Sequence, residues 1–254
     1  MKNLKERIKS GETVHGCWIN LGSPVAAEIV GKAGFDWVLI DLEHGAGNEA
    51  MMLTQLQILA GTSATAIVRT DEASRSKIQR ILDYGASGVM FPQFRDETEA
   101  REAVSLMYYP PKGTRGMAKM VRATAFSTNV DGYAANLVNS LLGVVQIETL
   151  GALDRLDAIA SLELVDVLFV GPSDLSLAMG IFNQFTHAEF QRVIKNVVQA
   201  AKKHGKVAGV LLQNINEYKM YHDLGYRFIA CGADTAFVMK GAAEMAEKMK
   251  MNGQ

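Results

Sequence analysis

The chain of 254 residues has little cysteine, almost no net charge and no long apolar run. Its two cysteines, Cys17 and Cys231, lack the paired spacings of zinc and redox motifs, so we expect reduced thiols in a core. A formal net charge of −1 without a basic cluster argues against nucleic-acid binding. No apolar run approaches the roughly 20 residues that cross a bilayer, and the segment from Met1 to Ser10 lacks a signal peptide's apolar stretch. We therefore expect a cytoplasmic protein that does not bind membranes.

Strand-like and helix-like runs alternate along the whole chain, which is typical of a parallel sheet built from βα units. Eight such units form a barrel of about 250 residues in one domain. We therefore predict a single (β/α)8 barrel over residues 1–254, in which the long helix from Ala233 to Met251 either completes the barrel or docks on another subunit. The predicted strands are Val14 to Ile19, Trp37 to Asp41, Ala64 to Arg69, Gly88 to Phe91, Leu142 to Glu148, Asp166 to Val170, Val207 to Leu212 and Arg227 to Cys231.

The C-terminal ends of several predicted strands carry residues that can hold a proton, a metal ion or an anion. Active sites of (β/α)8 barrels lie at these ends. Side chains alternate along a strand, and the outer face must be apolar to pack on helices. We therefore expect five polar side chains to point inward, which are Asp41, Glu43, Arg69, Gln146 and Glu148. Three further candidates follow strand ends: His44 after the second strand, and Ser173 and Asp174 after the sixth.

Two of these carboxylates, Glu148 and Asp174, follow adjacent strands without a lysine between them. A single acidic residue at such a place can be a helix N-cap, and Asp174 could serve as one, but Glu148 is a poor cap. Two neighbouring carboxylates repel each other unless a proton or a cation joins them. We therefore predict a divalent metal ion. Oxygen ligands favour Mg²⁺ or Mn²⁺, while a histidine nearby leaves Co²⁺ or Zn²⁺ open.

A reactive lysine is missing from the strand ends, and a histidine is present. Imine-forming aldolases need a lysine at a C-terminal strand end, whereas Lys206 precedes its strand. This favours a carbanion stabilised by a metal over one stabilised by an imine. Of five histidines, only His44 follows a strand end beside acidic groups. It is a candidate proton carrier, and the alternative is a loop histidine bonded to the backbone.

Longer phrases of the chain resemble a known family. The phrases are GFDWVLIDLEH from Gly34, YPPKGTRG from Tyr109, VVQIET from Val144 and GPSDLS from Gly171. In this order they resemble the HpcH/HpaI family of metal-dependent (class II) 2-oxo acid aldolases, over almost the full length of the chain. The resemblance implies a TIM barrel of the phosphoenolpyruvate/pyruvate type. It also implies reversible cleavage of a 4-hydroxy-2-oxo acid, with 2-keto-3-deoxy sugar acids among the candidates, to pyruvate and a short aldehyde.

The resemblance also implies a role for each site residue. Glu148 and Asp174 would hold the metal, Arg69 would stabilise the enolate, and His44 would carry the proton. Asp83 would act with His44 across a subunit boundary, although a solvated surface carboxylate is an equal alternative. Pyruvate would be bound by a further set of residues, which are Trp18, Asp41, Gln146, Ser173 and Leu211.

Family members form hexamers, as trimers of dimers, in which the C-terminal helix is exchanged between subunits, and the resemblance extends this expectation to the present chain. The sequence departs from the family pattern at TDEAS, from Thr70 to Ser74, and at Tyr108, so the acceptor aldehyde stays open. Two alternatives also stay open. One is a lyase of the citramalyl or malyl thioester type, which would need a basic coenzyme A groove that the sequence does not show. The other is a non-catalytic barrel that binds 2-oxo acids.

Overall fold

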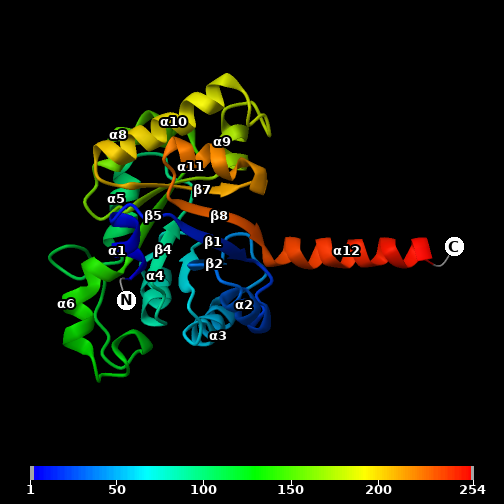
Figure 1. The fold of residues 1–254 in the computed structure, drawn as a ribbon. Coiled ribbons are helices and arrows are strands. Elements are labelled where there is room, and N and C mark those ends of the chain that lie inside the picture. Colours follow the sequence, from blue (N-terminus) through cyan, green and yellow to red (C-terminus); the bar gives the residue numbers. More distant parts are fainter. Residues whose placement is uncertain (1–2, 253–254) are drawn as a thin grey trace.

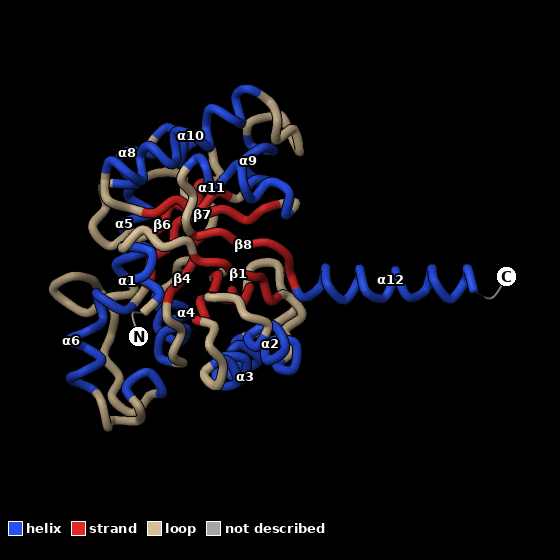
Figure 2. Tube along the Cα trace, viewed as in Figure 1, coloured by secondary structure: helices blue, strands red, loops and turns tan. Residues whose placement is uncertain are grey.

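The computed structural model describes residues 3–252, and its centre is a closed barrel of eight parallel strands in sequence order (Figures 1 and 2). The predicted (β/α)8 fold is therefore confirmed, and the strand boundaries agree with the predicted ones to within a residue or two. The strands are β1 (Val14–Ile19), β2 (Trp37–Asp41), β3 (Thr65–Arg69), β4 (Gly88–Phe91), β5 (Leu142–Ile147), β6 (Val167–Val170), β7 (Val207–Leu212) and β8 (Phe228–Ala233).

Most of the helices surround this barrel, and several begin at a polar residue whose side chain caps the first turn, as Ser23, Asn48 and Asp96 do. Pro172 opens the short helix that follows β6, because its fixed φ suits the first helical position. The helices are α1 (Leu4–Lys9), α2 (Pro24–Lys32), α3 (Glu49–Leu59), α4 (Arg75–Asp83), α5 (Glu97–Ser105), η1 (Arg122–Thr124), α6 (Val130–Ser140), α7 (Leu150–Asp154), α8 (Leu156–Ala160), α9 (Pro172–Ala178), α10 (Ala188–Lys203), η2 (Ile215–Glu217), α11 (Tyr218–Leu224) and α12 (Asp234–Asn252).

The inside of the barrel is filled with large side chains. Trp37 stacks on Phe228 with ring centroids 4.0 Å apart, and Trp18 meets Phe169 at 5.6 Å. Gly16 makes room for this packing, because a Cβ at that position would lie 2.1 Å from the Trp37 indole. A second apolar cluster lies between the strands and the surrounding helices. Because the interior is packed, a ligand can only be bound at one end of the barrel.

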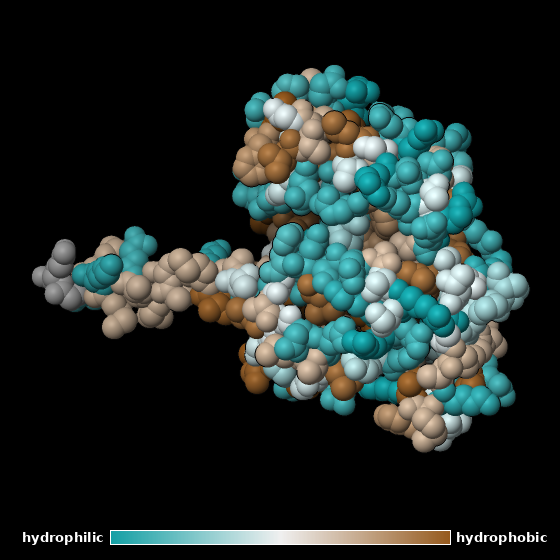
Figure 3. All heavy atoms as spheres, turned by 180° about the vertical axis from the view of Figure 1, so that it is seen from behind, coloured by the Kyte–Doolittle hydropathy of each residue, from teal (hydrophilic) through white to brown (hydrophobic). Residues whose placement is uncertain are grey.

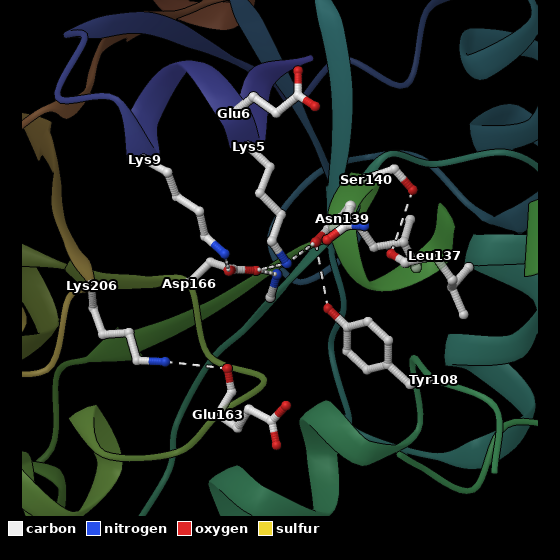
Figure 4. Close-up of polar contacts among 12 residues, drawn as sticks. Lys5, Glu6, Lys9, Tyr108, Leu137, Asn139, Ser140, Glu163, Asp166 and Lys206 are labelled. Carbon is white, nitrogen blue, oxygen red and sulfur yellow. Dashed lines mark hydrogen bonds and ion pairs between the residues drawn. The ribbon is translucent and has the colours of Figure 1, made fainter. Parts of the chain in front are cut away.

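The N-terminal end of the barrel is closed by α1 (Figure 4). The buried ammonium of Lys5 lies 2.8 Å from the Asp166 carboxylate and donates a hydrogen bond to the Leu141 carbonyl. Lys9 lies 3.6 Å from the same carboxylate. Lys206 donates to the Leu162 carbonyl, which precedes β6, so this lysine is at the opposite end from the predicted site, as expected. The candidate active site is therefore at the C-terminal end of the barrel.

The long helix α12 leaves the barrel and extends into solvent (Figures 1 and 2). Its contacts with the barrel are made to β1 and β8, and every residue from Thr235 to Asn252 is exposed. The interpretation of α12 as an ordinary eighth barrel helix is therefore wrong for this chain. Its surface includes exposed apolar side chains, seen in part in Figure 3: Phe237, Val238, Met239, Met245, Met249 and Met251. No helix within residues 3–252 has the length and apolar character to cross a membrane.

Candidate active site at the C-terminal end of the barrel

Arg69 is held rigidly between two acidic residues at the barrel mouth. Asp41 and Arg69 are direct neighbours in the register of β2 and β3. The Arg69 Nε and Nη2 atoms donate to the two Asp41 carboxylate oxygens at 2.9 and 2.7 Å, and Nη1 lies 2.9 Å from Glu43 Oε2. Desolvation lowers the pKa of Arg69, but the bonds to Asp41 and the charges of Asp41, Glu43 and Glu148 outweigh it and raise the pKa. The guanidinium is therefore a permanent, preorganised positive charge.

Glu148 is a buried carboxylate that forms no ion pair with a cationic side chain of residues 3–252. Its Oε2 accepts a 2.6 Å hydrogen bond from the Gln146 side chain, and its Oε1 accepts one of 2.9 Å from the Gln93 backbone. Gln93 adopts a left-handed conformation, with φ +60°, that presents this amide. Burial raises the Glu148 pKa to about 7, and the negative charges of Asp174 and Glu43 add to the rise. A cation bound beside Glu148 would lower this pKa and favour the charged carboxylate at neutral pH.

These residues fit a divalent metal ion bound through few protein ligands. Within the described residues, no group of three or more His, Cys, Asp or Glu side chains is arranged to hold a metal. Mg²⁺ is usually held by one or two carboxylates, with water or substrate oxygens completing its shell, and Glu148 with Asp174 provides that number. The buried Gln146 Oε1 has no hydrogen-bond partner in the described structure and could accept from a metal-bound water. Gly171 leaves space here, since a Cβ would lie 2.6 Å from Glu148 Oε2.

Asp174 and Ser173 lie in the first turn of α9, directly after β6. The N-cap of this helix is Gly171, and Asp174 makes no capping bond, so its interpretation as an N-cap is wrong. The first amides of a helix lack intrahelical acceptors and carry a partial positive charge. The amides of Ser173 and Asp174 therefore have no acceptor within α9, and their binding to the substrate carboxylate stays a prediction.

His44 is at the mouth, but its imidazole faces outward. Its side chain is 65% exposed, and Nε2 lies 4.0 Å from Glu43 Oε1. The His44 backbone amide bonds to Asp41 Oδ1 at 3.4 Å, so the loop carrying the imidazole is tied to the same carboxylate that holds Arg69. The imidazole forms no hydrogen bond with the described backbone, which does not match the alternative of a loop histidine bonded to backbone.

Asp83 is not part of the mouth, because it ends α4, which runs antiparallel to the strands. It is 8% exposed, so the alternative of a solvated surface carboxylate is wrong. Its Oδ1 accepts a 2.7 Å hydrogen bond from Arg115, whose guanidinium also donates to the Tyr133 hydroxyl at 2.8 Å. The fold therefore does not bring Asp83 and His44 together within one subunit.

The remaining predicted residues line or support the site. Trp18 is 4% exposed in the inner cluster, and the partly buried Leu211 packs against the same cluster. Asp41, predicted to bind substrate, directs both carboxylate oxygens to Arg69. Glu43 is at the mouth, as its place after the second strand predicts, and pairs with Arg69. Asn20 and Gln93 were not predicted. Asn20 follows the end of β1 and could have been found by position, whereas the contribution of Gln93 is a backbone amide that no side-chain pattern reveals.

The mouth of this (β/α)8 barrel holds a guanidinium between two carboxylates, next to a buried carboxylate. Such an arrangement can stabilise negative charge on an oxygen-rich ligand. The chain belongs to the HpcH/HpaI aldolase/citrate lyase family, whose model matches residues 15–241. The family consists of carbon–carbon lyases, and divalent-metal dependence is typical of it. The predicted class of carbon–carbon lyase is therefore confirmed.

Curated relatives match nearly the whole chain. A hydroxypyruvate/pyruvate aldolase of Pseudomonas aeruginosa is 34% identical over 250 residues, covering 98% of this chain and 93% of the relative. A 5-keto-4-deoxy-D-glucarate aldolase of Salmonella arizonae is 37% identical over 247 residues, covering 97% and 96%. The crystal structure of a family protein from Burkholderia cenocepacia superposes with a TM-score of 0.91 at 31% identity, covering 97% of this chain and 98% of that one.

Proposed function

We propose that this enzyme reversibly cleaves a 4-hydroxy-2-oxo acid, such as a 2-keto-3-deoxy sugar acid, to pyruvate and a short aldehyde. The observation that carries this proposal is the Arg69 guanidinium, which Asp41 and Glu43 hold next to the buried carboxylate of Glu148. Support comes from relatives named for hydroxypyruvate/pyruvate, 5-keto-4-deoxy-D-glucarate and 4-hydroxy-2-oxo-heptane-1,7-dioate. All of these names describe 2-oxo acids.

Arg69 retains free donors for a substrate oxygen. A guanidinium has five N–H bonds, and two of them donate to Asp41, while Nη1 forms an ion pair with Glu43. The N–H bonds on the two Nη atoms that do not face these carboxylates would be available to the keto oxygen of pyruvate. Because the guanidinium is already fixed, it stabilises the negative charge that grows on this oxygen as the enolate forms, without reorganising. Arg69 therefore acts mainly on the transition state.

Glu148 and Asp174 would hold the metal, with Mg²⁺ or Mn²⁺ preferred because the ligands are oxygen atoms. The bound ion would supply Lewis-acid stabilisation of the oxygen on which the enolate charge develops. Gln146 would orient a water or the ligand through its unpartnered Oε1. The first amides of α9 would bind the pyruvate carboxylate, and Trp18 and Leu211 would form the apolar wall. His44 would move the proton of the hydroxyl that becomes the aldehyde oxygen.

Assembly would complete the site. The exposed apolar side chains of α12 are suited to burial against another copy, and Asp83 lies too far from His44 within one subunit. We therefore propose a hexamer, a trimer of dimers with exchanged α12 helices, in which Asp83 of one subunit orients His44 of the next. The assembly would work in the cytoplasm, where the two free thiols of Cys17 and Cys231 stay reduced.

Exchange of the pyruvate methyl protons with deuterated water, followed by NMR, tests the proposal without knowledge of the aldehyde. We expect exchange with Mg²⁺ or Mn²⁺, loss of exchange in EDTA and recovery when metal is restored. Arg69→Lys should slow exchange, whereas Arg95→Lys, a change at an 82% exposed side chain, should not. Undiminished exchange in EDTA, or in Arg69→Lys, would contradict the mechanism. A panel of aldehydes offered with pyruvate then identifies the acceptor.

A further inference from the structure

A buried carboxylate lies at the base of α12 and has no role in the chemistry described above. Asp234, the first residue of α12, is only 3% exposed. Its Oδ1 accepts hydrogen bonds of 2.8 Å from the backbone amides of Asn20 and Thr235, and its Oδ2 accepts one of 3.2 Å from the amide of Leu21. Asp234 therefore connects α12 to the segment that directly follows β1.

Backbone groups alone stabilise the negative charge of Asp234 within the described structure. No lysine, arginine or histidine of residues 3–252 forms an ion pair with it, so three amides and the positive end of the helix dipole stabilise its charge. A buried carboxylate is costly when its hydrogen bonds are lost. The positions of Asn20 and Leu21 are consequently tied to the position of the first turn of α12.

Asn20 continues this connection to the catalytic arginine. Its side-chain Nδ2 donates to Asp41 Oδ2 at 3.2 Å, and the same oxygen accepts the 2.7 Å bond from Arg69 Nη2. Its carbonyl accepts a 2.7 Å bond from the amide of Ala46, in the loop that carries His44. One residue thus contacts the anchor of α12, the carboxylate that holds Arg69 and the histidine loop.

We propose that Asp234 is a positioning residue that couples the placement of α12 to the orientation of Arg69, through Asn20 and Asp41. The inference rests on the proposed function, since it concerns the same arginine. When α12 is held against another copy of the chain, the Asn20–Leu21 segment is fixed and Asp41 presents Arg69 to the keto oxygen. When α12 is free to swing, the segment loosens and the guanidinium loses its alignment. Assembly then raises the activity of the site although α12 contributes no reacting group.

The coupling has a characteristic kinetic signature. Loss of alignment should lower kcat for pyruvate proton exchange more than it changes KM, because Arg69 meets charge that grows only in the transition state. Residues that transmit coupling without touching ligand change it by roughly 2- to 30-fold. We expect Asp234→Asn to lower kcat within this range. Its amide nitrogen cannot accept a hydrogen bond, so either the Leu21 amide or the amides of Asn20 and Thr235 lose their acceptor.

The matched control is Asp131→Asn, which removes an exposed carboxylate from the first turn of α6. A second test variant, Asn20→Ala, removes the side-chain link to Asp41 but keeps the backbone amide that bonds to Asp234. Asn20→Ala keeps the inferred coupling testable if Asp234→Asn does not fold. We expect Asn20→Ala to lower kcat with unchanged sedimentation, and Asp131→Asn to match the wild type in both measurements.

The double variant separates coupling from general destabilisation. If Asp234 acts through Asn20, adding Asp234→Asn to Asn20→Ala should lower kcat little further, whereas independent effects would multiply. Multiplying effects, or wild-type kcat in folded Asp234→Asn or Asn20→Ala, would overturn the inference. Absence of exchange in the wild type would instead overturn the proposed function, so the two failures are distinguishable.

Discussion

Replacing Glu148 by Gln should stabilise the metal-free protein at pH 8 while abolishing its activity. In the absence of a cation, the Glu148 carboxylate is ionised at this pH although burial and the charges of Asp174 and Glu43 disfavour ionisation. A glutamine carries no charge, and its amide oxygen can still accept from the Gln93 amide. Rotation of the Gln146 amide would present its unpartnered oxygen to the new NH₂ group.

The size of the effect follows from the pKa. Burial raises the Glu148 pKa from 4.5 to about 7. At about 1.4 kcal/mol per pKa unit, full ionisation costs the folded state about 3 kcal/mol. Because the folded pKa exceeds the unfolded one, the cost from Glu148 is absent below pH 4.5, grows as the pH rises to 7, and is complete above pH 7. A cost of this size lowers the Tm of a chain this long by roughly 6–12 °C.

Thermal unfolding in EDTA between pH 5 and pH 8 measures this effect. The Tm difference between Glu148→Gln and the wild type should be small at pH 5 and grow to its full value by pH 8, and added Mg²⁺ should raise the Tm of the wild type alone. Glu28→Gln, a change at an exposed glutamate paired with Lys32, should show no such growth. Parallel curves for Glu148→Gln and the wild type across the pH range would refute the account of Glu148 as an uncompensated carboxylate.

Three further predictions concern assembly and backbone strain. Inactive His44→Ala and Asp83→Ala subunits, once unfolded and refolded together, should recover part of the wild-type activity, whereas no recovery would place the two residues in independent roles. Phe237→Asp should reduce the sedimentation coefficient, because it places a charge on the apolar surface of α12; an unchanged coefficient would remove α12 from the interface. Gln93→Gly should stabilise the folded protein by about 1 kcal/mol in urea unfolding, because glycine adopts φ +60° freely. The variant should also retain activity, since it keeps the amide that binds Glu148. A lower free energy of unfolding would show that the left-handed conformation of Gln93 is not strained.

Local sequence patterns were sufficient for the barrel and for the placement of several polar residues at its mouth, whereas Trp18, Leu211 and Asp83 were proposed only from the resemblance to the family. Alternation along β5 places Gln146 and Glu148 on one face, and the structure joins these two side chains by a 2.6 Å hydrogen bond. The inward placement of Asp41 and Arg69 likewise follows from strand periodicity. Local patterns could not predict what α12 packs against, because its apolar side chains are equally compatible with packing on its own barrel or on another chain.

The sequence by itself determined the eight βα units and the residues that end each strand, because periodicity and turn chemistry act between near neighbours in the chain. Only the tertiary structure decided that Asp234 reaches Asn20, that the Gln93 amide bonds to Glu148, and that Asp83 pairs with Arg115 instead of reaching the mouth. These contacts join residues that are distant in sequence or belong to the backbone. They depend on how the closed barrel brings separate loops together, and no local pattern of side chains encodes that arrangement.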